Sequence, residues 1–99
     1  MRIVMLSQAE EDLDQIASYY RGQNERLSSE FEAAVRHTFE QIRFHPLAWA
    51  PLTRRIRRCL LHRFPYGIIY RVTEESILIL AVVHNQRGPD TWRDRLRRH

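Results

Sequence analysis

Four side chains that can do chemistry are predicted to meet at one end of a β-sheet: Arg63, Tyr66, His84 and Arg87. Guanidinium groups bind phosphate or carboxylate through paired hydrogen bonds, and histidine exchanges a proton near neutral pH. Cleavage of an RNA phosphodiester through its own 2′-hydroxyl needs a base, an acid and positive charge near the developing oxyanion. His84, Arg63 and Arg87 can supply parts of that chemistry. The alternative is that His84 only ends a buried strand and hydrogen-bonds to neighbouring backbone.

The expected meeting of these residues follows from the order of three strands near the C-terminus. The last two are joined by a tight turn, so antiparallel pairing places His84, at the end of the last strand, near Tyr66 or Gly67. The strand before them is expected to pair on the other side and to place Arg63 across from Gly67. Arg87 follows just beyond the last strand.

The rest of the chain supplies the elements that position these residues. Apolar residues recur at helical spacing in the first half, and strand-like segments separated by turn residues follow. Ser7 and Glu10 have capping-box spacing, and the acidic residues nearby, Asp12 among them, complement the dipole of the first helix. The pattern predicts an α+β fold with the order β-α-α-β-β-β-α. The expected elements are a strand at 2–6, helices from 7 to about 22 and from about 24–27 to 44, a loop at 46–55, a β-meander with strands at 56–63, 68–73 and 77–83, and a short basic helix opened by Gly88-Pro89.

Composition excludes several classes of protein. With 99 residues, 43% hydrophobic and 28% charged, the chain is expected to form one globular domain over 1–99. A lone cysteine, Cys59, cannot form an internal disulfide and favours a reducing compartment such as the cytoplasm. The longest apolar run, 77–83, is too short to cross a membrane, and a signal-peptide pattern is missing. No metal-ligand spacing, phosphate-binding glycine loop or nucleophile elbow is present, so neither a cofactor nor a metal is expected.

Charge is distributed unevenly along the chain. Residues 1–40 carry four arginines and eight acidic residues, a net of −4, whereas residues 41–99 carry twelve arginines and four acidic residues, a net of +8; the sum is +4. All sixteen basic residues are arginine. Codon usage in a GC-rich genome accounts for the missing lysine but not for the segregation of charge. The asymmetry indicates a partner rich in phosphate or carboxylate.

A dense run of arginines leads into the first strand of the meander. Strand alternation sends Arg55 and Arg57 to one face and Arg54 and Arg58 to the other, so part of the run must extend over the core or pair with an acid. Trp92 is expected to hold the C-terminal helix against the sheet; the alternative is that it presents its ring to a base or a partner. The residues expected to bind a target or a partner protein are Arg54, Arg55, Arg57, Arg58, Arg63, Tyr66, Arg71, Arg87 and Trp92.

Three motifs in order resemble the RelE/ParE toxins of bacterial type II toxin–antitoxin systems. They are AEEDLDQIASY from Ala9, RFPYGIIYRV from Arg63, and ILILAVVHNQR from Ile77, the last followed by P-x-x-W. The resemblance implies an α-helical hairpin packed on a mostly antiparallel sheet. It also implies a toxin of the plasmid-stabilisation type, with a cognate antitoxin that wraps it with a flexible, often acidic tail.

The family divides by target: RelE-like members cut mRNA on the ribosome, and ParE-like members poison DNA gyrase. The nuclease pattern has lysines before the meander, an arginine shortly before the strand tyrosine, and a late tyrosine. Here lysine is absent, residues 67–69 before Tyr70 contain no arginine, and Trp92 stands near the late tyrosine position; only Arg87 matches. The resemblance favours a gyrase poison that is not an enzyme. A ribosome-dependent mRNA endonuclease using the histidine and arginines named above is one alternative, and a decayed toxin that only binds its antitoxin is another.

Overall fold

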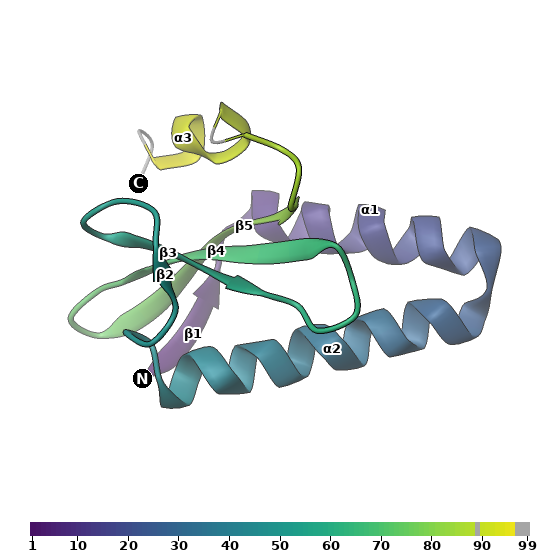
Figure 1. The fold of residues 1–99 in the computed structure, drawn as a ribbon, viewed down its shortest axis with the longest axis horizontal. Helices are drawn as coiled ribbons and strands as arrows, with labels where there is room; N and C mark the ends of the chain where they lie inside the picture. The colour runs from purple at the N-terminus through teal and green to yellow at the C-terminus, as the bar shows by residue number, and fades with distance from the viewer. Residues whose placement is uncertain (89, 97–99) are drawn as a thin grey trace.

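The computed structural model describes residues 1–88 and 90–96 and confirms the expected α+β fold (Figure 1). The predicted place of Pro89 at the start of the last helix and the basic tail at 97–99 lie outside these residues. The described elements are β1 (Arg2–Met5), α1 (Ser7–Gln23), α2 (Glu25–Phe44), β2 (Ala50–Pro51), β3 (Ile56–Leu60), β4 (Tyr66–Val72), β5 (Ser76–His84) and α3 (Asp90–Leu96).

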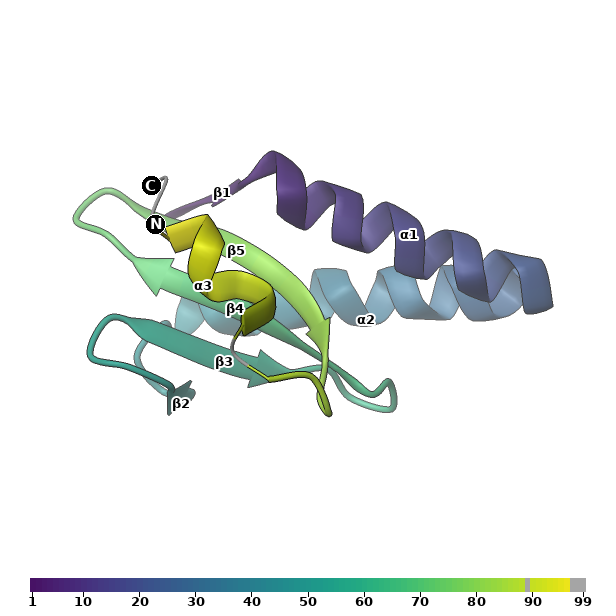
Figure 2. The same cartoon turned by 90° about the horizontal axis from the view of Figure 1, so that it is seen from above.

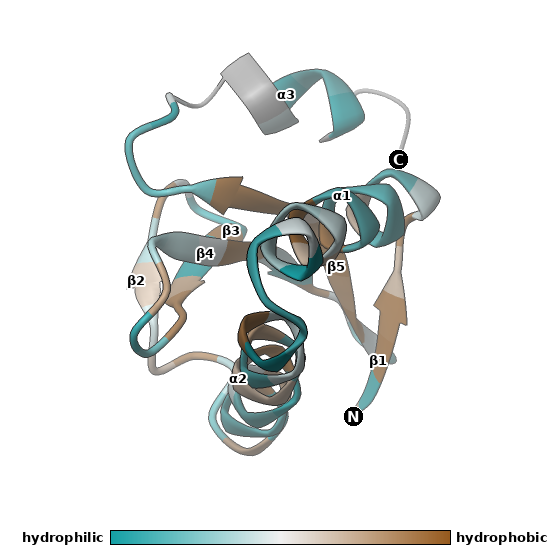
Figure 3. Cartoon of the chain, turned by 90° about the vertical axis from the view of Figure 1, so that its right-hand side faces the viewer, coloured by the Kyte–Doolittle hydropathy of each residue, from teal (hydrophilic) through white to brown (hydrophobic). Residues whose placement is uncertain are grey.

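The strands form a mixed sheet in the order β1-β5-β4-β3-β2. Strands β3, β4 and β5 pair antiparallel as the predicted meander, whereas β1 pairs in parallel with β5, from Arg2 with Ser76 to Met5 with Ile79. Figures 2 and 3 show α2 and α3 on opposite faces of the sheet, and α1 packs along α2 and β5. Because β5 has a strand on each side and helices over both faces, almost every one of its side chains is apolar.

The second helix has clear signals at both ends. The side chain of Asn24 accepts a hydrogen bond from the Arg26 amide at 2.8 Å, which caps the first turn. The helix ends at Phe44, two residues before Pro46, whose ring disfavours helical backbone in the residue before it. Phe31 and Ile42 lie on its buried face. The predicted start and end of this helix are confirmed.

The predicted capping box at the start of α1 is wrong. Leu6, not Ser7, is the cap residue, and no side chain caps the helix there. The Leu6 amide still bonds to the Ile79 carbonyl of β5, while its own carbonyl accepts from the Glu10 amide. The chain therefore passes from sheet to helix at one residue, because that placement buries the Leu6 side chain in the core.

The first strand of the meander is shorter than predicted. It ends at Leu60 rather than at residue 63, and the Leu61 amide closes a turn onto the Tyr66 carbonyl. Arg63 has a φ of 73°, in the left-handed region, so the backbone cannot continue as a strand there. Within the predicted loop at 46–55, residues 50–51 form the edge strand β2, where a proline is tolerated.

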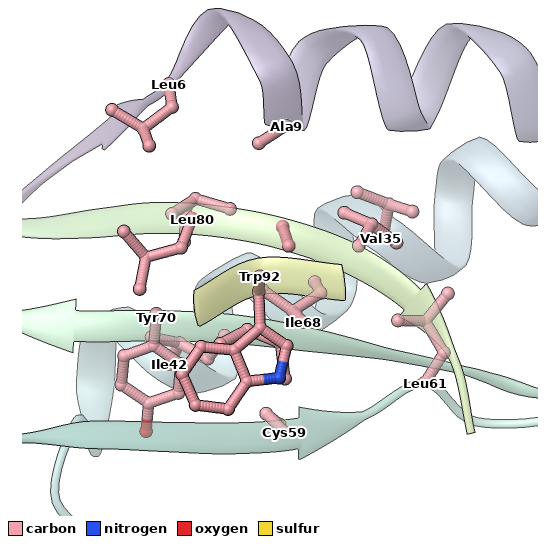
Figure 4. Close-up of a cluster of buried hydrophobic side chains, with 14 of the residues drawn as sticks. Leu6, Ala9, Val35, Ile42, Cys59, Leu61, Ile68, Tyr70, Leu80 and Trp92 are labelled. Carbon is pink, nitrogen blue, oxygen red and sulfur yellow. The ribbon is translucent and has the colours of Figure 1, made fainter. Parts of the chain in front are cut away.

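The core lies between the helical hairpin and the sheet, and Trp92 reaches toward the sheet from α3 (Figure 4). Phe31 is 1% exposed and packs its ring against those of Tyr20 and Phe64, with centroids 5.5 Å from each. Tyr70 is fully buried, and its hydroxyl donates to the Pro46 carbonyl at 2.6 Å. That hydrogen bond satisfies the one polar atom that the ring brings into the core.

Alkaline pH is expected to destabilise this core through Cys59 and Tyr70. Burial raises the pKa of the Cys59 thiol from 9.0 to about 11. Burial, followed by the charge of the nearby Cys59, raises the pKa of Tyr70 from 10.0 to about 12. As the pH rises, the unfolded chain loses these protons before the folded chain does. The contribution of the two groups to the free energy of unfolding is therefore complete below about pH 9 and is lost between about pH 9 and pH 12. Urea denaturation across this range measures the loss. The Tyr70→Phe variant should lose less stability above pH 10 than the parent; an identical profile would contradict the assignment.

Candidate functional site

A groove of about 600 Å³ opens beside the C-terminal end of β5, between α1 and α3. We call it the rim groove. The structure brings together three of the four residues predicted to meet, and adds polar residues of α1 and α3 that the prediction did not include. The polar residues that matter here are Asp12, Gln15, Tyr66, His84, Arg87 and Arg95.

Tyr66 and His84 lie opposite each other on β4 and β5, as the predicted register required. Their rings meet edge to face, with centroids 5.3 Å apart and planes at 77°. Tyr66 also contacts Phe31 and Tyr20, so the groove rests on the aromatic part of the core. Burial, followed by the adjacent Tyr66, raises the pKa of Tyr20 above its ordinary value.

The imidazole of His84 is held by its own backbone turn. Its Nδ1 accepts a hydrogen bond from the Gln86 amide at 3.2 Å. In a neutral imidazole one nitrogen accepts and the other carries the proton, so Nε2 carries it here. His84 therefore offers a hydrogen-bond donor. To act as a base it would first have to break the bond to Gln86.

A partly buried ion pair forms the floor of the rim groove. Arg95 of α3 binds Asp12 of α1 through both nitrogens, at 2.6 and 3.1 Å, and the side chains are only 21% and 17% exposed. Asp12 also accepts from the Val82 amide at 3.0 Å, and Arg95 donates to the Leu80 carbonyl at 3.0 Å. The two side chains thus bond to β5 as well as to each other.

The position of this pair explains its geometry. Strand β1 accompanies β5 only as far as Ile79, so the edge of β5 beyond that residue has no neighbouring strand within the described residues. Asp12 and Arg95 bind the backbone groups that a longer β1 would have bound. The pair was missed because Asp12 was interpreted as a first-turn acid and no local pattern points to Arg95.

The predicted place of Arg63 is wrong. Leu60, not Arg63, pairs with Gly67. Arg63 lies in the turn after β3, where its side chain is 63% exposed and contacts Glu30 of α2 at 3.4 Å. The turn, with its left-handed residue, directs the arginine toward the helical hairpin and away from the rim groove.

The remaining arginines of the predicted binding set are spread over two regions. Arg54 and Arg55 lie exposed in the bend before β3, where they line a shallow cleft with Arg71. Arg57 is half-buried and donates to the Trp49 carbonyl at 2.9 Å, so it satisfies the expectation that part of the run extends over the core. Arg58, on the other face of the strand, leads to a second hollow.

This second hollow, of about 200 Å³, lies between α3 and the sheet. We call it the arginine hollow. It is lined by Leu52, Thr53, Arg58, Ile69, Val83, Arg87, Trp92 and Arg93. Trp92 is 4% exposed, so it holds α3 against the sheet, as predicted, and does not present its ring to solvent. Arg93 was not among the predicted site residues.

Among residues 1–88 and 90–96, no group of three or more His, Cys, Asp or Glu side chains is placed to hold a metal ion. Within the same part of the chain, no helix has both the length and the apolar character needed to cross a bilayer.

The fold is that of the RelE/ParE class of toxins, as comparison with solved structures shows. The chromosomal ParDE toxin–antitoxin system from P. aeruginosa matches with a TM-score of 0.63 at 22% identity, over 85% of this chain and 95% of that one. The toxin–antitoxin complex RelBE2 from Mycobacterium tuberculosis matches with a TM-score of 0.57 at 24% identity, over 84% and 95%.

Sequence comparison narrows the class to one family. The model of the ParE toxin of the type II toxin–antitoxin system parDE matches residues 3–89, so the chain belongs to the ParE toxin family. Toxin ParE2 of Mycobacterium tuberculosis, strains H37Rv and CDC 1551, is 39% identical over 85 residues, which cover 82% of this chain and 78% of the relative.

Proposed function

We propose that this toxin arrests growth by poisoning DNA gyrase, that it acts by binding and not as an enzyme, and that a cognate antitoxin neutralises it in the cytoplasm. Membership of the ParE family supports the choice of gyrase over the ribosome. Similar solved structures include a ParDE system and a RelBE2 toxin–antitoxin complex, which supports an antitoxin partner for this chain as well.

One observation carries the non-enzymatic part of the proposal: neither the rim groove nor the arginine hollow combines arginines with a base that is free to take up a proton. In the rim groove, Nδ1 of His84 is already bonded to backbone, and the Asp12 carboxylate is bound by Arg95. The arginine hollow contains three arginines but no histidine, tyrosine or carboxylate among its lining residues. Cleavage through a 2′-hydroxyl needs a group that takes up the proton, so positive charge alone does not suffice.

The antitoxin is proposed to bind the arginine-rich side of the sheet with an acidic segment. Arg54 and Arg55 are exposed, and no carboxylate of the described residues pairs with either. Charge-assisted bonds from such guanidinium groups to carboxylates are stronger than neutral hydrogen bonds. A short acidic protein with a DNA-binding N-terminus, encoded beside this gene, is the expected partner.

The purified toxin is expected to inhibit gyrase at near-stoichiometric amounts. Relaxed plasmid, gyrase and ATP are incubated with increasing toxin, and supercoiled product and protein-trapped linear DNA are resolved on gels. Supercoiling should fall or linear DNA should accumulate, and prior addition of the neighbouring acidic protein should restore activity. No effect at stoichiometric excess would contradict the proposal.

The alternatives give different results in parallel experiments. A nuclease would cleave mRNA in a translating extract, and its His84→Ala variant would lose that cleavage. A decayed toxin would leave growth unaffected when expressed without its partner. A gyrase poison should instead cause filamentation and DNA damage in cells.

A further inference from the structure

We propose that the arginine hollow is a binding site for the phosphates of a nucleic-acid strand. This inference rests on the proposed function for its setting, because a poison of gyrase meets DNA at its target. The physical basis of the inference is independent of gyrase. Three arginines from distant parts of the chain surround one apolar floor.

The three arginines come from different elements and have no counter-charge among the side chains that the structure describes. Arg58 lies on β3, Arg87 follows β5, and Arg93 lies on α3. No carboxylate that the structure describes lines the hollow or lies within salt-bridge distance of these three residues. By contrast, the arginines that do form ion pairs face the helical hairpin or the rim groove. Concentrating like charges without a partner is unfavourable unless an anion binds there.

Gly67 makes room for one of these arginines. A Cβ atom at Gly67 would lie 3.1 Å from both Cγ and Cδ of Arg58, so the aliphatic stem of Arg58 lies directly across the glycine. A Cβ atom at position 67 would require the stem to shift by a few tenths of an ångström. The absence of a side chain at Gly67 therefore allows the Arg58 stem to lie close to β4.

A second device places Arg93. Trp92, its neighbour on α3, is almost completely buried, and two residues further on Arg95 is bound to Asp12 and to the Leu80 carbonyl. With buried contacts on both sides, the backbone of Arg93 is held over the sheet. The backbone that carries the third arginine is therefore in place before any ligand arrives, which lowers part of the entropic cost of binding, whereas the Arg93 side chain is exposed.

The lining favours nucleic acid over an acidic peptide. Between the arginines the floor is formed by Ile69 and Val83, so the charged groups are spaced by apolar surface. A nucleic-acid strand offers a phosphate at each nucleotide with a sugar between, and guanidinium forks match phosphate oxygens geometrically.

The test measures binding of a fluorescein-labelled oligonucleotide to the whole toxin by anisotropy, without gyrase. The Arg58→Gln and Arg93→Gln variants should each weaken binding about tenfold and reduce the salt slope by about one. Matched controls are Arg36→Gln and Arg43→Gln, which remove the same charge from α2 on the opposite face and should change affinity less than about twofold. Gly67→Ala keeps every charge and shifts the Arg58 stem by only a few tenths of an ångström, so it should weaken binding less than Arg58→Gln does. Circular dichroism verifies that each variant is folded.

Several results would overturn the site. Equal losses in the hollow variants and the α2 controls would mean diffuse attraction by net charge. Competition by a polyglutamate peptide as effective as by the oligonucleotide would assign the hollow to an acidic protein. If inorganic phosphate saturates the arginine hollow and the oligonucleotide binds no more tightly than phosphate does, the hollow is a site for the free ion. Gyrase inhibition that persists in hollow variants unable to bind the oligonucleotide would overturn the link to the target and leave the proposed function intact. Oligonucleotide binding by a toxin that leaves gyrase active would contradict only the proposed function.

Discussion

Replacing Asp12 with alanine is expected to lower the free energy of unfolding by about 2–4 kcal/mol. The change leaves the Arg95 guanidinium largely buried without its carboxylate and removes the acceptor of the Val82 amide. Removing one partner of a buried pair costs more than the pair contributes, because the remaining charge has lost its water. The figure is at the lower end for such pairs because both side chains keep some contact with solvent.

Urea denaturation followed by circular dichroism measures this loss, and Glu30→Ala is the matched control. Glu30 pairs with Arg63 and Arg26, both largely exposed, so its removal should cost less than about 1 kcal/mol. Similar losses of unfolding free energy in the two variants would mean that the Asp12–Arg95 pair does not hold α3 against the rest of the fold. If the pair does place Arg93, the Asp12 variant should also bind the oligonucleotide more weakly while still folded.

The Phe31→Ala variant is expected to lose about 3–5 kcal/mol of stability. The ring is 1% exposed and lies at the centre of an aromatic cluster with Tyr20, Phe64 and Tyr66, so its removal leaves a cavity that rigid rings cannot fill by collapse. A loss of this size is a large part of the stability of a domain of about 100 residues.

The matched control lies on the same helix. Phe44 is 72% exposed, so Phe44→Ala should change the free energy of unfolding by less than about 0.5 kcal/mol. Because Tyr66 joins the cluster to His84, the Phe31 variant should also shift the NMR signals of the His84 ring. A stability loss under about 1 kcal/mol would show that the cluster repacks around the gap, contrary to expectation.

The pairing of Tyr66 with His84 could be predicted from the sequence because the two strands follow each other directly along the chain. A tight turn joins two strongly apolar or alternating strands, and counting outward from the turn sets the register. The same counting failed for Arg63. The turn before β4 begins at Leu61, and no residue type in that segment indicates that Arg63 adopts a left-handed backbone conformation.

The ion pair and the hollow could not be predicted for a different reason. Asp12 has a complete explanation as a carboxylate near the start of a helix, so its contact with Arg95, 83 positions away, leaves no local trace. Likewise, the predicted strand at 68–73 left Gly67 outside it, whereas Gly67 lies within β4 and leaves space for a neighbouring strand's side chain. Both features depend on which elements become neighbours in space.

The parallel pairing of β1 with β5 has a consequence for how the chain is made. The N-terminal strand is synthesised first, yet its partner residues are 76–79, and the bond from Asp12 to Arg95 needs α3, the last described helix. A growing chain can therefore form its helical hairpin early, but β1 has no partner in the sheet until β5 has been made. A ribosome that stops before β5 releases a product with neither the rim groove nor the arginine hollow. Both concave sites therefore depend on the part of the described chain that is made last.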